Sequence, residues 1–291
     1  MSGEVGLVTD STAEIHALGP RTSWHVVPLA LEMDGERYRE GPELSAADFH
    51  QLLQEANSPP STLPPSIEAF EEAYRELLGT YRRIVSVHLS GELSDTVEHA
   101  REAARRLGEV ERIRVIDSML AGPALGLLCL ELEERIRSGR ALPEAVSETE
   151  EIAGVACVYF SVYTLDFLYL GGRLERSPPS SASTQEDRPI LTMRDGRLKL
   201  VERVIGETSR VERMAELVEE RFGSDEPLAA AVVHAGVRGR EAARRIEQRL
   251  LATPPDRAAA WRRAPLGPVL CAHTGFDVCG VAAYPLALSA L

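Results

Sequence analysis

Four polar side chains stand in segments that fit neither a plain core nor a plain surface. They are Thr62, Ser94, Arg173 and His273. Hydroxyl and imidazole groups can donate hydrogen bonds to a carboxylate, and the planar fork of an arginine can donate two at once. These residue types are suited to holding an anionic head group, provided that the fold brings them together.

The arginine has the most distinctive context of the four. An apolar, helix-like segment at residues 163–170 ends at Gly171 and Gly172, and Arg173 follows at once. Glycines allow a positive φ or a close approach of the backbone to a neighbour. The pattern indicates that Arg173 leaves a buried segment rather than a solvated face.

Each of the four residues also has an ordinary explanation. Thr62 and Ser94 fit hydroxyls of a loop or a helix N-cap. Arg173 fits a solvated cation that complements a helix C-terminus, and His273 fits a hydrogen-bonded histidine at the end of a strand. Sequence context alone leaves these alternatives open.

Six short motifs occur in an order that is typical of one protein family. They are Val-Gly-Leu-Val-Thr-Asp-Ser-Thr-Ala at 5–13, Thr-Leu-Pro-Pro-Ser at 62–66, Leu-Ser-Asp-Thr at 93–96, Tyr-Leu-Gly-Gly-Arg at 169–173, Arg-Pro-Ile-Leu at 188–191 and His-Thr-Gly at 273–275. Together these motifs resemble the DegV family of bacterial fatty-acid-binding proteins. The resemblance runs from about residue 4 to about residue 285.

The resemblance implies a function and a set of site residues. Some DegV proteins are the carrier component of bacterial fatty acid kinase: they bind one long-chain fatty acid in a buried tunnel between two domains and present its carboxylate for acyl-phosphate formation. Thr62 and Ser94 match the family's head-group hydroxyls, and Arg173 and His273 match its arginine and histidine near the head group. The chain is then expected to be a lipid carrier rather than an enzyme, with a fatty acid as ligand and no cofactor.

The chain departs from the family pattern beside two of these residues. Leu63 and Pro64 stand where a Ser-Gln pair is usual, which removes polar groups and stiffens the loop. Asp95 stands where a glycine is usual and brings a negative charge towards the expected carboxylate. Because the helix dipole favours an acidic residue at a helix start, we expect Asp95 to point outward.

A serine hydrolase acting on a lipid or an acyl ester is the alternative function. Ser94 and His273, with an aspartate such as Asp117, supply the residue types of a nucleophilic triad. Ser94 lacks the Gly-x-Ser-x-Gly elbow that presents such a nucleophile. The chain also has no P-loop and no kinase-like glycine-rich loop, so we expect any ATP chemistry to belong to a partner protein.

Composition limits the classes of partner. A net charge of −13 over 291 residues disfavours general binding to nucleic acid or to an anionic membrane, because both need a basic surface. The N-terminus has no apolar signal-like region, and the charge-free stretch at 119–130 is too short to cross a bilayer. We therefore expect a cytoplasmic protein without stable membrane insertion.

The cysteines and histidines indicate neither a disulfide nor a metal site. No Cys-x-x-Cys pair occurs, and the 7 histidines form no pair with the spacing of metal ligands. The 4 cysteines lie in apolar surroundings and are expected to be buried thiols. They are Cys129, Cys157, Cys271 and Cys279.

Strand and helix patterns alternate through residues 1–155. Short β-rich runs predict strands at 5–8, 26–31, 84–87 and 114–117, and amphipathic runs predict helices at 46–55, 67–78, 96–107 and 121–137. This alternation predicts a mostly parallel sheet in a three-layer α/β/α domain. In such folds ligands bind beyond the carboxyl ends of the strands.

Residues 156–291 follow a different order. The pattern predicts strands at 156–162, 190–193, 198–204, 228–234, 268–272 and 278–286, the last two paired as a hairpin, and helices at 211–222 and 240–251. Asp195-Gly196 is a strong signal for an antiparallel hairpin, and residues 177–187 are loop-like. The expected fold class is therefore α/β with two domains, a parallel one at 1–155 and an α+β one with a mixed sheet at 156–291.

Overall fold

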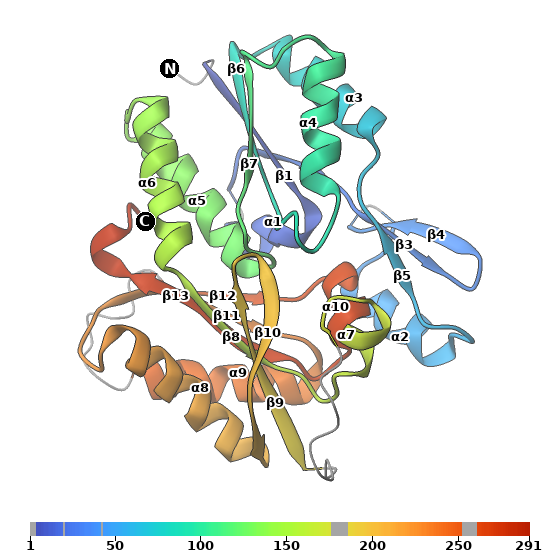
Figure 1. The fold of residues 1–291 in the computed structure, drawn as a ribbon, viewed down its shortest axis with the longest axis vertical. Coiled ribbons are helices and arrows are strands. Elements are labelled where there is room, and N and C mark those ends of the chain that lie inside the picture. The colour runs from blue at the N-terminus through green and yellow to red at the C-terminus, as the bar shows by residue number, and fades with distance from the viewer. Residues whose placement is uncertain (1–3, 20, 42, 176–185, 252–260) are drawn as a thin grey trace.

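The computed structural model describes residues 4–19, 21–41, 43–175, 186–251 and 261–291 (Figure 1). A parallel sheet of four strands lies in the upper part of that view and has the order β2-β1-β6-β7. Its strands are β1 (Val5–Asp10), β2 (Trp24–Val27), β6 (Arg83–His88) and β7 (Ile113–Asp117). The predicted parallel sheet in the first half of the chain is confirmed.

Helices cover both faces of this sheet. On one face lie α3 (Ile67–Leu78) and α4 (Thr96–Arg106), and on the other lie α1 (Ile15–Leu18), α5 (Pro123–Arg137) and α6 (Leu142–Val155) (Figure 1). Side chains alternate along the strands, so Val8 packs in the α3 and α4 cluster whereas Leu7 packs in the α5 cluster. The alternation produces the expected three-layer α/β/α arrangement.

The second sheet is mixed and has six strands in the order β10-β9-β8-β13-β11-β12. Its strands are β8 (Cys157–Ser161), β9 (Asp187–Arg194), β10 (Arg197–Ile205), β11 (Leu228–His234), β12 (Trp261–Pro265) and β13 (Cys279–Pro285). Only β11 and β12 pair in parallel, and the other pairs are antiparallel. Helices α8 (Glu207–Phe222) and α9 (Gly236–Leu251) cover one face, as Figure 1 shows.

The hairpin predicted at Asp195-Gly196 is confirmed. Strands β9 and β10 pair in register on either side of it, with Leu198 opposite Met193. The turn places Asp195 at φ +52° and Gly196 at φ +74°, which is the left-handed region that Asp-Gly sequences tolerate. The segment predicted as a loop at 177–187 lies mostly outside the described residues, and Asp187 already belongs to β9.

The single strand predicted at 26–31 is wrong, because the chain there forms two strands in different sheets. After β2, Pro28 and Leu29 interrupt the pairing, and β3 (Ala30–Met33) continues in a third sheet of order β4-β3-β5. Its other strands are β4 (Glu36–Arg39) and β5 (Ser61–Leu63), and α2 (Ala46–Glu55) lies between them in sequence. Proline cannot donate to a strand ladder, which explains the break.

The strand predicted at 268–272 is also wrong, since this segment begins helix α10 (Pro268–Thr274). Proline at the first helical position has a φ suited to a helix and has no amide to leave unpaired. Short apolar runs do not distinguish a buried strand from a buried helix. Strand β13 consequently pairs with β8 and β11, and the predicted hairpin between 268–272 and 278–286 does not form.

The proposed domain division at residue 155 remains a prediction. It falls between the end of α6 and the start of β8. One continuous core crosses it, because Leu7 and Leu125 from the first half share a buried cluster with Ala231 and Tyr284 from the second. Any independent movement of the two halves would therefore have to disturb a shared apolar interface.

Two further expectations concern the cysteines and the membrane. All four cysteines are buried free thiols, as predicted. Among the helices that the structure describes, none combines the length and the apolar character needed to cross a bilayer.

Candidate functional site

A cavity lies beyond the carboxyl ends of the parallel strands, between the first sheet and the six-stranded sheet. The space inside and at its opening, counted together with the solvent there, is about 890 Å³. Most of the side chains that line it are apolar, including Leu89, Leu93, Phe160, Leu266 and Val269. Apolar walls with a few polar groups are typical of sites for small organic ligands.

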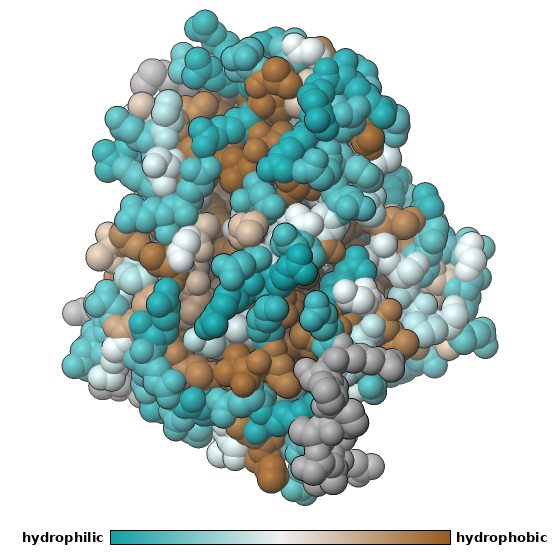
Figure 2. Space-filling model, viewed as in Figure 1, coloured by the Kyte–Doolittle hydropathy of each residue, from teal (hydrophilic) through white to brown (hydrophobic). Residues whose placement is uncertain are grey.

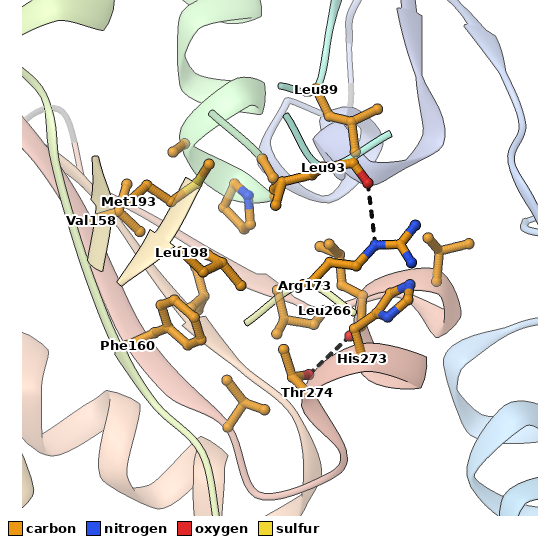
Figure 3. A pocket seen from close by; sticks show the side chains of 18 of the residues that line it. Leu89, Leu93, Val158, Phe160, Arg173, Met193, Leu198, Leu266, His273 and Thr274 are labelled. Carbon is orange, nitrogen blue, oxygen red and sulfur yellow. Dashed lines mark hydrogen bonds between the residues drawn. The ribbon is translucent and has the colours of Figure 1, made fainter. Parts of the chain in front are cut away.

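All four candidate residues line this cavity. Thr62 lies on β5, Ser94 in the turn before α4, Arg173 just after α7 (Asp166–Leu170), and His273 on α10. Among the described residues that line the cavity, the polar side chains are these four together with Thr274. Arg173 and His273 lie on one side, and Val158 and Met193 lie on the opposite side (Figure 3). The cavity is thus polar at one end and apolar at the other.

Thr62 and His273 are in direct contact although 211 positions separate them in sequence. Thr62 Oγ1 lies 2.8 Å from His273 Nε2. Pairing of β5 with β3 sets Thr62 opposite Leu31 and so fixes its position beside α10. The contact joins the three-stranded sheet to the helix that carries the histidine.

The tautomer of His273 follows from its surroundings. Its Nδ1 is buried and has no hydrogen-bond partner among the described residues, so a proton on Nδ1 would be left unpaired. Burial, and then the charge of Arg173, lowers the pKa of His273 to about 4, so the ring is neutral near pH 7. We therefore assign the proton to Nε2, which donates to Thr62 and leaves the Thr62 hydroxyl hydrogen available for a ligand.

The glycine pair before Arg173 has two separate roles. A Cβ on Gly171 would lie 2.3 Å from His273 Nδ1, so glycine allows α7 to pack directly on the imidazole. Gly172 has φ +68° and turns the chain back after α7. Both properties expected of the pair, close approach and a positive φ, are confirmed.

Arg173 is partly buried and is held by backbone carbonyls. Its Nε donates to the Leu93 carbonyl at 3.2 Å (Figure 3), and its NH1 donates to the Gly171 carbonyl. Burial lowers the pKa of Arg173, and the negative charge of Asp95 opposes that shift. Asp95 itself is exposed at the start of α4, which agrees with the outward orientation expected for it.

Ser94 lies on the same loop that Arg173 contacts. Its Oγ is 2.8 Å from Thr96 Oγ1, a hydroxyl of the same Leu-Ser-Asp-Thr motif that was not among the expected ligand residues. No hydrogen bond joins Ser94 to His273 in the described part of the chain: Ser94 Oγ contacts Thr96, and His273 Nε2 contacts Thr62. Asp117 accepts instead from the amides of Gly91 and Met119. The triad of the alternative hydrolase is therefore not assembled.

Comparison with known proteins supports the same family as the motifs. Residues 4–286 match a family model described as an uncharacterised protein of the DegV family. The chain belongs to the DegV family. A DegV domain-containing protein of Streptomyces coelicolor is 34% identical and aligns over 97% of this chain and 98% of its own length. Protein DegV of Bacillus subtilis is 30% identical over 95% and 98% of the two chains.

Solved structures of other DegV proteins have the same fold. One from Thermus thermophilus, whose structure is described as showing fatty acid binding, has a TM-score of 0.89 at 30% identity and covers 97% of this chain and 100% of its own. DegV of Bacillus subtilis, described as a fatty acid binding protein, has a TM-score of 0.81 at 30% identity, with 96% and 98% covered. The α/β class with a parallel and a mixed sheet is thus the DegV fold.

In this DegV chain a second Ser-His-Asp arrangement is assembled, and the sequence interpretation missed it. Ser86 Oγ lies 2.6 Å from His88 Nε2, and His88 Nδ1 lies 3.1 Å from Asp10 Oδ2. All three residues are fully buried, so no substrate can reach the serine. Asp10 also accepts from the amide of Leu89 at 2.9 Å, which fixes the start of the loop towards Ser94. Ser86 and His88 are two positions apart on one strand, so their side chains lie on the same face of the sheet. This spacing is the signal that could have revealed their contact.

Two carboxylates, which the sequence interpretation also missed, hold the start of α10 in this DegV chain. Glu14 accepts from the Gly267 amide at 2.5 Å, and Glu40 accepts from the Val269 amide at 2.8 Å. A Cβ on Gly267 would lie 2.6 Å from an oxygen of each carboxylate, so both carboxylates pack closely against this glycine. Burial raises the pKa of Glu14, and it raises that of Glu40 to about 7.

Replacement of Glu40 by glutamine should flatten the pH dependence of stability. In the native state Glu40 keeps its proton up to about pH 7, whereas an unfolded glutamate releases it near pH 4.5. The free energy of unfolding should therefore fall as the pH rises from 4.5 to 7, by on the order of 3 kcal/mol from this residue. Urea denaturation of both proteins across this pH range measures the difference. Parallel pH profiles would show that Glu40 is ionised in the native protein.

No group of three His, Cys, Asp or Glu side chains in the described residues is placed to hold a metal ion. Thr62, Ser94 and Arg173 supply donors at one end of the cavity, and His273 Nε2 donates to Thr62 beside them.

Proposed function

We propose that this protein binds one long-chain fatty acid in the cavity between its two halves, with the carboxylate near Thr62 and Ser94. One observation carries the proposal: an apolar cavity whose polar lining is gathered at one end. That arrangement suits an amphipathic ligand with one anionic head. The fatty-acid binding described for the Thermus and Bacillus relatives supports the same ligand class.

The apolar walls can supply most of the binding free energy. Burial of about 15 methylene groups at ~0.8 kcal/mol each stabilises the complex by on the order of 12 kcal/mol, and association costs roughly 4 to 15 kcal/mol. A carboxylate that lost its water without gaining partners would cancel much of this gain. Donors at the polar end are therefore needed to offset the desolvation of the head group.

We further propose that the bound carboxylate is presented to a separate fatty acid kinase for acyl-phosphate formation, as in carrier members of the family. The sequence contains no P-loop to bind ATP, so the phosphoryl donor would belong to the partner. A reaction that consumes ATP would place the protein in the cytoplasm. Arg173, beside the polar end, is suited to balance the charge that phosphoryl transfer adds.

The ligand class can be tested directly on the purified protein. Denaturing extraction followed by lipid mass spectrometry should release saturated or monounsaturated long-chain fatty acids in amounts close to one per protein. Recovery of only a phosphorylated sugar or a nucleotide would contradict the proposal. Incubation with p-nitrophenyl acyl esters tests the hydrolase alternative, and we expect no turnover above background.

Replacement of Thr62 by valine, or of Ser94 by alanine, should weaken fatty-acid binding roughly 10- to 100-fold. Each change removes a hydrogen bond to a charged group, which is worth about 1.5 to 3 kcal/mol. Equilibrium binding of a fluorescent fatty acid measures the effect. Thr192→Val on strand β9 is the matched control, because Thr192 does not line the cavity. Unchanged affinity in both head-group variants would reject their assignment.

A further inference from the structure

The apolar end of the cavity lies against the hairpin of β9 and β10. Met193 and Leu198 face each other across this hairpin, one on the strand before the turn and one on the strand after it. Both side chains line the cavity. In Figure 3 Met193 lies beside Val158, on the side of the cavity away from Arg173 and His273.

The tip of the hairpin is fastened to the loop that follows β6. Ser90 Oγ donates to the Gly196 carbonyl at 2.8 Å, and Arg197 forms an ion pair with Glu92. The fit is close, because a Cβ on Gly196 would lie 2.4 Å from Ser90 Oγ and 3.2 Å from Met119 Cε. These contacts connect the hairpin to the first sheet and hold Met193 and Leu198 over the end of the cavity.

The two sides of the hairpin differ in character. Lys199, next to Leu198 in sequence, is exposed and does not line the cavity. Hydrophilic residues gather at the centre of the face shown in Figure 2, where Figure 1 places the tip of the hairpin. The inner side therefore presents only apolar side chains to the cavity, as the methyl end of an acyl chain requires.

We propose that Met193 and Leu198 form the end wall of the cavity and set the length of the acyl chain that binds. This inference rests on the proposed fatty-acid ligand and adds its length-determining residues. If the carboxylate lies at Thr62, the acyl chain extends away from Arg173. Its methyl end then contacts Met193 and Leu198 at the other end of the cavity. Met193 is unbranched and partly exposed, so this wall is made of a flexible side chain rather than of backbone.

The wall can be tested by shortening it. Met193→Ala removes three non-hydrogen atoms and should admit a chain about two carbons longer, with each added methylene strengthening binding about fourfold. The measured quantity is the affinity for the acid two carbons longer, divided by the affinity for the acid that the wild type binds best. We expect this ratio to be roughly 15-fold higher in the variant than in the wild type. Leu198→Ala should shift the profile in the same direction. Dissociation constants are measured for saturated fatty acids of increasing even chain length.

Two comparisons make the result decisive. Lys199→Ala, on the outer side of the same hairpin, should keep the wild-type length profile, and melting temperatures of all variants establish that they are folded. If Met193→Ala and Leu198→Ala are both folded and both keep the wild-type length profile, the assignment of these residues as the end wall is wrong. The proposed fatty-acid binding would not be affected by that result. A wild-type protein that binds no fatty acid of any length would overturn the proposed function itself.

Discussion

Replacement of Arg173 by alanine should reduce acyl-phosphate formation with a cognate fatty acid kinase roughly 100- to 1,000-fold. Phosphoryl transfer adds negative charge at the head group, and loss of a cation aimed at developing charge has effects of this size. Fatty-acid binding should weaken by no more than about fivefold, since a partly exposed charge is screened by water and the tail supplies most of the binding free energy. Single-turnover phosphorylation and equilibrium binding, measured on the same preparations, separate the two effects.

Arg173→Lys and Arg194→Ala are the informative comparisons. Lysine keeps the charge but cannot reproduce the planar fork that reaches the Leu93 and Gly171 carbonyls, so it should restore activity only in part. Arg194 is exposed near the hairpin turn and does not line the cavity, so its loss controls for the change in net charge. An alanine variant of Arg173 that lost binding and phosphorylation in equal proportion would instead identify Arg173 as a ligand of the free carboxylate.

Replacement of Glu131 by alanine should lower the free energy of unfolding by about 3 to 5 kcal/mol. Glu131 is fully buried on α5 and pairs with the buried Arg135. It also accepts hydrogen bonds from the Tyr284 hydroxyl at 2.6 Å and from the Ala290 amide at 2.8 Å, so it fastens the C-terminal segment to the helix. Alanine would leave Arg135 without its principal carboxylate and the C-terminal donors without an acceptor. Urea denaturation measures the loss.

Glu134→Ala provides a matched control on the same helix. Glu134 pairs with Arg137, whose side chain is 75% exposed, and surface pairs of this kind contribute about 0 to 1 kcal/mol. We expect the two substitutions to differ by several kcal/mol. Equal and small effects would mean that Glu148, 3.0 Å from Arg135, compensates fully for the missing Glu131.

The family and most of the secondary structure could be predicted from sequence because they depend on local signals. The spacing of apolar residues predicted the helices now seen as α3 and α4, and the Asp195-Gly196 dipeptide predicted the hairpin that carries Met193. Gly171 and Gly172 indicated a close approach and a turn, and both occur. Such signals are read from neighbouring residues, whose conformational preferences change little with the rest of the fold.

Short apolar segments depended more strongly on the tertiary structure. Residues 268–272 have no periodicity long enough to separate strand from helix, and what favours the helix is the pair of distant carboxylates on Glu14 and Glu40 that accept from its first amides. Pro28 divides a run that is continuous in composition into strands of two sheets. At 268–272 the outcome depends on partners that are far away in sequence, whereas the break at Pro28 is a local effect and only the pairing of β2 and β3 in different sheets is tertiary.

The candidate site likewise depends in part on the sequence and in part on the tertiary structure. The sequence by itself determined which side chains were available, namely Thr62, Ser94, Arg173 and His273, and it determined their family. Only the folded chain decided that Thr62 bonds to His273, that Ser94 does not, and that Met193 and Leu198 of one hairpin line the cavity. The reason is physical: the hydrogen bond between Thr62 and His273 joins residues 211 positions apart, and no local pattern encodes the distance between them.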